Sequence, residues 1–483
     1  MVVNIRIIAK MLSPAVTGFG VIALIPAIYA LISGTPGAFS FISVTVLAVA
    51  IGNILRIIGK NSPNLIALRE LFLFTFLLWS ILALIASLPF FIQLDDIDFL
   101  AALFESVSSL STTGATVINN LDVRPPSILL WRSILQYLGG IGFVVIGIAV
   151  LPTLALGGMN LFKTESIDGR TKLTPHIKTM AFALLMFYIV LLILCTGCYI
   201  FFGLDIFLAI NAAMCTVATG GMMPIDASMN GLPAGVHYSA IVFMFICSCP
   251  FLIILASFTE SRSLFFKDEQ IRGLFLIIVF FSAAVILSLI FYNGYDVERA
   301  IRIGLFNVTS IISSTGFSLE DFSKWNSFAS VIFLSIFAIG GCSGSTSGGI
   351  KIFRIQVCYR MLKCNMLRSL HPHGVIFPRF NGTEINSMTS FSVVSFLVAY
   401  ILVTFCSTLA ATLMGLPITD AFTATLTCLS NIGPTMGDVV LPNSANFASV
   451  SGPLHLLFSI DMLLGRLEII PVLLCFTRFF WRK

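Results

Sequence analysis

The stretch SVSSLSTTGAT at residues 106–116 closes a short apolar segment with a Ser/Thr-rich turn at Gly114. Three later stretches repeat this pattern: AMCTVATGGM at 213–222, VTSIISSTGFS at 308–318 and TLTCLSNIGPT at 425–435. The glycines that close the four turns, Gly114, Gly220, Gly316 and Gly433, are separated by 106, 96 and 117 residues. One pattern that recurs at a near-constant period indicates internal repeats, and we therefore predict four of them.

The composition around these turns indicates a membrane protein. Hydrophobic residues make up 58% of the 483 residues, charged residues only 10%, and the mean hydropathy is +1.02. Soluble domains carry about 25% charged residues, so this chain cannot cover a soluble surface. A spanning helix needs about 20 apolar residues. Ten such segments are predicted, near 11–33, 38–55, 71–93, 127–156, 179–203, 234–258, 273–293, 325–360, 387–415 and 449–478.

Four shorter apolar stretches lie between spans, near 99–111, 206–217, 298–313 and 420–430. Each begins at or near an aspartate that is expected to cap a helix: Asp98, Asp205, Asp296 and Asp420. We interpret each repeat as a spanning helix, a short re-entrant helix, a glycine turn and a second spanning helix. The predicted fold is an all-α polytopic membrane protein in which two leading helices (1–65) precede four repeats around a central pore, at 66–160, 161–265, 266–380 and 381–483.

The distribution of charge predicts the orientation of the chain. Of the 27 Lys and Arg residues, 21 lie in segments that this topology places on one side. Nineteen of these 21 lie in the segments Arg56 to Arg69, Lys163 to Lys178, Arg262 to Arg272, Lys351 to Arg379 and the C-terminal RFFWRK. The side rich in positive charge is cytoplasmic in membrane proteins. We therefore expect both termini in the cytoplasm, and the net charge of +5 does not indicate a nucleic-acid partner.

The four turns can form an ion pathway. Non-helical backbone inside a membrane is tolerated only where protein buries it or water reaches it. If the repeats surround one axis, the turns are buried together and their carbonyl groups can replace the water shell of a cation. The short helices would also point their partly negative C-terminal ends at the centre, which favours cations. Glycines that merely allow close helix packing are the alternative, but packing explains one turn more easily than four matched turns.

These motifs, their order and the two leading helices resemble the membrane subunit of bacterial Trk potassium uptake systems. That family belongs with the Ktr and plant HKT proteins to a superfamily related to potassium channels. Two further stretches match it, GGCSGSTSGGIKIFR at 340–354 and MLLGRLEI at 462–469, so the resemblance covers essentially the whole chain.

The resemblance implies potassium uptake across the bacterial cytoplasmic (inner) membrane. K⁺ would bind to backbone carbonyl groups of a selectivity filter. In relatives, a serine in place of the first filter glycine is associated with sodium transport, so four glycines imply potassium. The implied filter residues are Thr112, Thr113, Gly114, Ala218, Thr219, Gly220, Ser314, Thr315, Gly316, Asn431, Ile432 and Gly433.

The glycine-rich stretch of the third repeat lies inside a predicted span. Glycine disfavours helix there, and a passive kink is one interpretation. A phosphate-binding loop is not, because Gly344 and Gly349 do not fit GxxxxGK[ST]. A broken helix at membrane depth usually lines a cavity, and the resemblance implies an intramembrane gate below the filter. The expected gate residues in this stretch are Gly340, Gly341, Gly344, Gly348 and Gly349.

Arg466 follows Gly465 in the middle of an apolar segment. A charge at that depth is costly and is a candidate functional site. The resemblance implies that this arginine projects into the permeation path as part of the gate. The alternative is a structural ion pair with Asp461 or Glu468, which lie on the same predicted helix.

Two other functions remain open at this point. A proton- or sodium-coupled carrier would need buried carboxylates or histidines along its path, and Asp461 and Glu468 are almost the only ones at helix centres. A membrane-embedded enzyme would show Asp/His-rich clusters, and the sole hint is LHPHG around His371 and His373.

The resemblance also implies partners. They are a second copy of the chain in a homodimer, and a cytosolic ring of TrkA-like nucleotide-binding regulatory subunits. No cofactor is expected in this chain, because K⁺ is the transported ion and the nucleotide belongs to the partner. Membrane lipid surrounds the protein. Lys351, Arg354, Arg360, Lys363 and Arg368 form a candidate docking cluster for the ring, although ordinary orientation charge explains them equally well.

Overall fold

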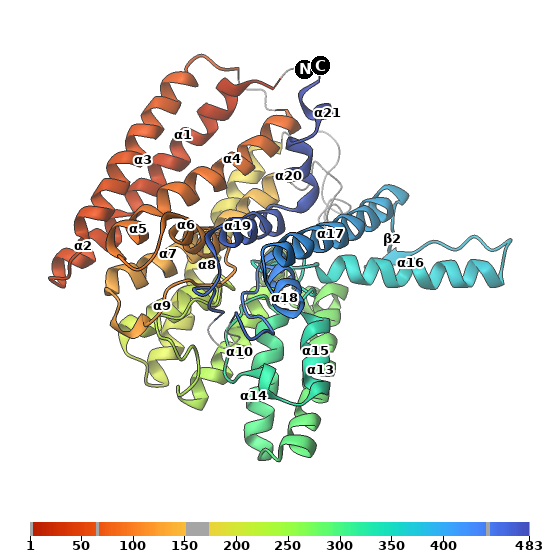
Figure 1. The fold of residues 1–483 in the computed structure, drawn as a ribbon. Helices are drawn as coiled ribbons and strands as arrows, with labels where there is room; N and C mark the ends of the chain where they lie inside the picture. The colour runs from red at the N-terminus through yellow and green to blue at the C-terminus, as the bar shows by residue number, and fades with distance from the viewer. Residues whose placement is uncertain (1–2, 64–66, 151–172, 441–444, 483) are drawn as a thin grey trace.

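The computed structural model describes residues 3–63, 67–150, 173–440 and 445–482. Figure 1 shows that these residues form helices packed side by side, with one small hairpin. The hairpin consists of β1 (Arg379–Phe380) paired antiparallel with β2 (Thr383–Glu384). The chain is an all-α polytopic membrane protein, as the sequence predicts.

Seven helices in the described ranges are long and apolar enough to cross a membrane. They are α1 with α2 (Ile5–Ile22 and Leu24–Ile32), α3 (Ala38–Ile58), α4 with α5 (Leu68–Ala86 and Leu88–Gln93), α7 (Pro126–Val150), α8 (Leu173–Phe201), α13 (Glu269–Asn293) and α17 (Ser387–Leu413). The pair α10 (Ala234–Ser248) and α11 (Phe251–Thr259) makes an eighth, bent by 91°. The bend falls at Pro250, which has no N–H for the helix ladder.

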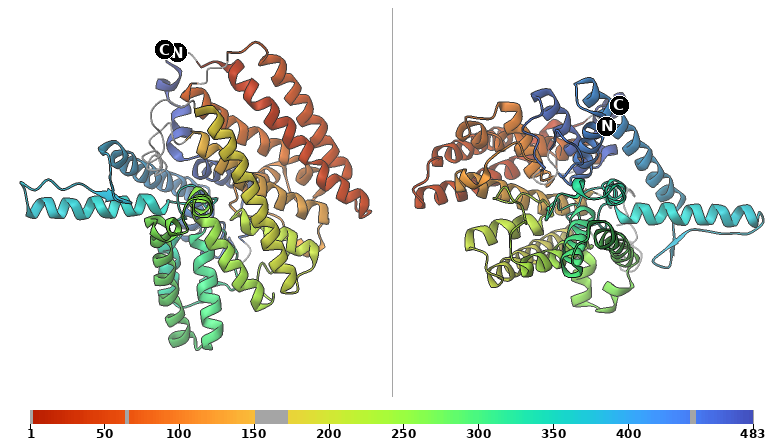
Figure 2. Two further views of the ribbon diagram at one scale, coloured as in Figure 1. Left: turned by 180° about the vertical axis from the view of Figure 1, so that it is seen from behind. Right: turned by 60° about the horizontal axis from the view of Figure 1, so that its bottom comes forward.

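The two remaining predicted spans differ from the expectation. The segment 325–360 is not one interrupted helix: α15 (Ser327–Ile336) is short, and α16 (Ile352–Leu370) leaves in another direction (Figures 1 and 2). The glycine-rich loop between them is closed by a bond from Gly340 N to Ile350 O of 2.9 Å. The segment 449–478 is divided into α19 (Gly452–Arg466) and α20 (Ile469–Cys475), because Glu468 has a φ of +67°. Such a backbone angle ends a right-handed helix.

The four short helices lie where the sequence predicts them: α6 (Phe99–Leu110), α9 (Ile206–Val217), α14 (Val297–Ile312) and α18 (Ile418–Ser430). Asp98, Asp205 and Asp296 each accept a backbone hydrogen bond at the helix start, as expected. The expectation is wrong for Asp420. That residue lies within the first turn of α18, and its carboxylate accepts from Val439 N (3.0 Å) and Val440 N (3.1 Å).

Packing links the repeats in sequence order. After the first, second and fourth turns, the following helix packs on the short helix of the next repeat: α7 on α9, α10 on α14, and α19 on α6. The predicted repeat division stays a prediction. Its boundaries at 65/66 and 160/161 lie outside the described residues, as does much of the predicted basic segment from Lys163. The boundary at 265/266 falls in α12 (Ser263–Lys267), and 380/381 falls at the end of β1. The remaining short elements are η1 (Leu121–Val123), η4 (Phe322–Lys324) and α21 (Arg478–Trp481).

The two ends of the described chain meet the start of α4. Asn4 N donates to Glu70 Oε1 (3.1 Å), and Arg69 donates to the carbonyl groups of Phe480 (3.1 Å) and Arg482 (2.9 Å). The N-terminus, the C-terminus and the connection before α4 therefore lie on one face of the protein.

The α16 arm, consisting of α16 and the β1–β2 hairpin, projects from the helical body (Figure 1). Its predicted basic cluster is not one surface patch. The side chains of Lys351 and Arg354 are buried, at 6% and 4% exposed, while Arg360 pairs with Glu269 at 2.6 Å. Lys363 is exposed. Two of the five cations are therefore packed inside the protein, which the linear pattern of charge could not indicate.

Candidate ion pathway

The four turns share one backbone conformation. Each has a residue with left-handed φ, an intervening residue and then a glycine with positive φ. The left-handed residues are Thr112 (+57°), Thr219 (+51°), Ser314 (+54°) and Asn431 (+54°). The glycines are Gly114 (+88°), Gly221 (+77°), Gly316 (+81°) and Gly433 (+94°).

In the second repeat, the glycine with this conformation lies one residue after the predicted one. The glycine that matches the other three is Gly221, not the predicted Gly220, which corresponds instead to Thr113, Thr315 and Ile432. In the sequence, Thr219-Gly220 resembles Thr113-Gly114 of repeat one and Thr315-Gly316 of repeat three, which led to the wrong alignment. In the structure, Thr219 has the left-handed φ of Thr112 and Ser314, so it matches those residues and not Thr113 and Thr315. The two consecutive glycines at 220 and 221 were the available signal.

The turns close into a ring. A Cβ on Gly114 would meet the carbonyl oxygen of Gly220, and a Cβ on Gly433 would lie 2.7 Å from that of Thr113. Between them, Gly221 faces the carbonyl of Thr315 in the same way, and Gly316 faces that of Ile432. Each glycine thus packs against the carbonyl of the next repeat, in the order one, two, three, four and back to one. No side chain fits at these positions without displacing backbone.

The carbonyl groups of this ring are short of donors. In the described part of the chain, no hydrogen bond is donated to the carbonyl oxygens of Thr113, Thr315 or Ile432, although all three residues are buried. Gly220 is the exception, since its carbonyl accepts from Gln136 Nε2. Buried carbonyl groups are normally paired. Unpaired carbonyl groups that face one another in a ring are suited to coordinating a cation that has lost its water.

A cavity opens on one side of the ring. Gly114, Gly221 and Gly316 line it together with the loop at 222–228, in which Asp226 is exposed. The cavity lies between the ring and this loop.

The glycine-rich loop lies against the opposite side of the turns. Gly348 N donates to Ser314 Oγ (2.5 Å), and Thr219 Oγ1 donates to Thr346 Oγ1 (3.2 Å). A Cβ on Gly348 would also meet the carbonyl of Ser430. The loop at 340–349 therefore contacts the turns of repeats two, three and four. Of the expected gate glycines, Gly344 and Gly349 have positive φ, whereas Gly340, Gly341 and Gly348 lie in close backbone contacts.

Arg466 reaches this loop. Its side chain is 1% exposed and donates to the carbonyl oxygens of Thr346 (2.8 Å) and Gly139 (3.3 Å). Its guanidinium also covers the ring of Phe143 at 4.4 Å. Neither proposed acidic partner binds it: Glu468 pairs with Arg354 at 2.5 Å, and Asp461 accepts from Ser407 at 2.7 Å. The alternative of a structural ion pair for Arg466 is therefore wrong.

A second buried cation binds the next carbonyl of the loop. Lys351 Nζ donates to Ser347 O, the residue after the one that Arg466 holds. The linear pattern of charge predicts Lys351 at the surface, and its position inside the glycine-rich motif was the only signal for burial. Glu105 and Arg132, which form a buried ion pair behind the ring, were also missed, although charges inside apolar segments are a recognised signal.

The register of the second turn predicts different effects for two neighbouring substitutions. Gly221→Ala should lower cation uptake per folded molecule by about tenfold. A Cβ there meets the backbone of Thr315, and left-handed φ costs about 1–2 kcal/mol, where 1.36 kcal/mol is a factor of ten in rate. Gly220→Ala should cost less, because its Cβ meets the side chain of Gln136. Uptake of ⁸⁶Rb⁺ into liposomes, normalised by size-exclusion recovery, compares the two. A larger loss at Gly220 would contradict the shifted register.

Comparisons with known proteins identify the family of this chain. A family model described as a cation transport protein, TrkH, matches residues 38–483. The Trk system potassium uptake protein TrkI of Halomonas elongata is 33% identical over 95% of this chain and 93% of its own. TrkH of Escherichia coli K12 is 32% identical over 99% of this chain and 100% of its own. The crystal structure of the potassium transporter TrkH from Vibrio parahaemolyticus superposes with a TM-score of 0.90 at 32% identity, covering 99% of both chains. This chain therefore belongs to the TrkH family of cation transport proteins, and it is a transporter rather than a membrane-embedded enzyme.

Proposed function

We propose that this protein takes up potassium ions across the cytoplasmic membrane through the ring of four turns. The observation that carries the proposal is the closed ring of buried carbonyl groups, three of which have no donor in the described part of the chain, built on glycines that exclude any side chain. Carbonyl rings of this kind coordinate dehydrated cations. The relatives named above are potassium uptake proteins, which supports K⁺ as the ion. In this proposal the filter residues of the second repeat are Thr219, Gly220 and Gly221.

The proposed gate combines the glycine-rich loop with Arg466. The loop contacts three of the four turns, and the guanidinium is bonded to its Thr346 carbonyl. A K⁺ ion passing about 7 Å from this charge would be repelled by about 2 kcal/mol at an effective dielectric of about 20. That repulsion corresponds to a barrier of about thirtyfold. Conduction would then require the loop and the guanidinium to move aside together.

A coupled carrier is the second candidate, and Asp461 is the observation that favours it. The residue is buried, one oxygen accepts from Ser407, and the other has no hydrogen-bond partner in the described ranges. A buried carboxylate is what proton or sodium coupling requires. We favour gated passive conduction, because Asp461 lines neither the cavity beside the ring nor a second cavity, which lies between the glycine-rich loop and Arg466.

The proposal includes the partners implied by the resemblance, a second copy of the chain and a cytosolic nucleotide-binding ring. The α16 arm supports a homodimer, because it exposes an apolar stripe at helical spacing: Tyr359, Leu362, Met366 and Leu370. The nucleotide-binding partner would bind on the cytoplasmic face, where Lys363 is exposed. The two chain ends and the connection before α4 lie on one face, which agrees with cytoplasmic termini.

The direct test is uptake of ⁸⁶Rb⁺ into liposomes that contain the pure protein, with K⁺ and Na⁺ as competitors. K⁺ should compete strongly and Na⁺ weakly. Gly114→Ser should relax this discrimination, because its added side chain would meet the carbonyl of Gly220. No K⁺-sensitive uptake by the wild type would contradict the function, and an unchanged preference in folded Gly114→Ser would contradict the filter assignment.

Arg466→Ala should raise the flux per folded molecule, by up to about thirtyfold if the whole electrostatic barrier is lost. Since Arg466 has no acidic partner among the contacts described above, the substitution leaves no carboxylate unpaired. Flux at or below the wild-type level, with normal size-exclusion recovery, would remove the gating role.

Asp461→Asn separates conduction from coupling. The amide can still accept the Ser407 hydroxyl, so folding should be preserved. Passive conduction predicts the same ⁸⁶Rb⁺ flux as the wild type at every imposed pH gradient. If the wild-type flux follows the pH gradient and the variant loses that dependence, the carrier replaces the gated pore.

A further inference from the structure

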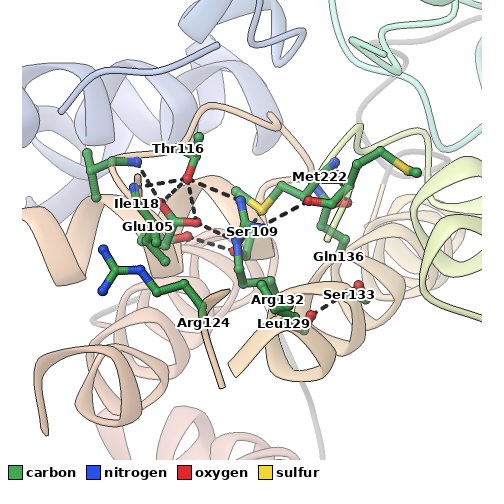
Figure 3. A network of polar contacts seen from close by, with 12 residues as sticks. Glu105, Ser109, Thr116, Ile118, Arg124, Leu129, Arg132, Ser133, Gln136 and Met222 are labelled. Carbon is green, nitrogen blue, oxygen red and sulfur yellow. Dashed lines mark hydrogen bonds and ion pairs between the residues drawn. The ribbon is translucent and has the colours of Figure 1, made fainter. Parts of the chain in front are cut away.

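A buried ion pair lies directly behind the first turn (Figure 3). Glu105 belongs to the short helix α6 and Arg132 to α7, and the two side chains are 0% and 2% exposed. Arg132 Nε donates to Glu105 Oε1 at 2.7 Å. Figure 3 also shows that Arg124 takes no part in this network; it pairs with Asp96 at the exposed outer side.

The pair holds the chain that follows the ring glycine. Glu105 Oε2 accepts from the Val117 N–H (2.8 Å), and both carboxylate oxygens accept from the Thr116 hydroxyl (3.1 and 3.0 Å). Arg132 donates to the same hydroxyl (3.1 Å) and to the carbonyl of Met223 (3.3 Å). Met223 lies two residues after Gly221, so one guanidinium connects the outer ends of the first and second turns.

The third repeat contains a neutral version of the same anchor. Asn307 precedes Gly316 by the same number of residues as Glu105 precedes Gly114. Its Oδ1 accepts from Leu319 N at 3.1 Å, the position that matches Val117. The corresponding residues of repeats two and four are Ala212 and Ala424, which cannot accept such a bond. An amide is therefore enough to anchor one turn, and the charge in repeat one needs another explanation.

We propose that the Glu105–Arg132 pair is a positioning unit that fixes the first turn relative to the second and thereby sets the discrimination between K⁺ and Na⁺. Arginine supplies what the amide of repeat three lacks, a planar fork of donors that reaches two repeats at once. The carboxylate is required because an unpaired charge in a buried site is strongly unfavourable. It also cancels the arginine's charge next to the ion path, since Arg132 lines the cavity outside the ring.

The decisive variant is Arg132→Lys, which keeps the charge beside Glu105 but loses the fork that joins Thr116 to Met223. We expect normal folded recovery and about a tenfold rise in the potency of Na⁺ against ⁸⁶Rb⁺ uptake, equivalent to about 1.4 kcal/mol. Glu105→Gln keeps an acceptor for Val117 N but leaves Arg132 uncompensated beside the path. It should lower uptake and also weaken discrimination. Asp96→Asn removes an exposed charge pair on the same side and is the matched control, with no change expected.

The test distinguishes positioning from a purely structural role. A lower folded yield with unchanged Na⁺ competition per folded molecule in both variants would overturn the proposal, and so would unchanged competition at normal yield. The inference rests on the proposed function, so hydrogen exchange provides a readout that does not need transport. Folded Arg132→Lys should exchange faster at the amides of Val117 and Met222. If the wild type shows no K⁺-sensitive uptake, the proposed function is wrong. If hydrogen exchange at Val117 and Met222 is also unchanged in Arg132→Lys, the positioning role of the ion pair is wrong as well.

Discussion

The contact of each ring glycine with the carbonyl of the next repeat is the interaction on which the rest of the structure depends. Backbone outside a helix cannot face lipid, because its polar groups would have no partners. Here four such turns are buried against one another, and each is closed by its neighbour, as Gly433 is against Thr113. The helices of each repeat enclose the ring, and α7, α10 and α19 carry the packing from one repeat to the next.

The four turns share one conformation, but the repeats differ in their buried charged side chains. The first repeat carries a buried ion pair at the outer side of the ring. The third and fourth supply the loop and the arginine on the opposite side, joined through the carbonyl of Thr346. Buried charges are expensive and are kept only where they are well paired or have a role. Their separation onto the two sides of the ring fits a division between selecting an ion and controlling its passage.

The sequence predicted the elements that depend on local chemistry. The short helices begin at Asp98, Asp205 and Asp296 because an aspartate accepts the free N–H groups of a first turn. The same reasoning failed at Asp420, whose carboxylate binds the distant loop at Val439 and Val440 instead. It also failed at Gly220, since two adjacent glycines give no local preference for which of them takes positive φ.

By itself, the sequence determined the membrane environment, the short helices and the four recurring glycine turns, because hydropathy, periodicity and helix capping are properties of neighbouring residues. Only the tertiary structure decided which glycine completes the ring, which carbonyl groups Arg466 binds, and that Lys351 and Arg354 are buried. Those outcomes depend on residues far apart in the sequence: Gly221 and Thr315 are 94 positions apart, and Arg466 and Thr346 are 120 apart. A linear pattern of charge or glycine cannot specify such partners, because packing in three dimensions selects them.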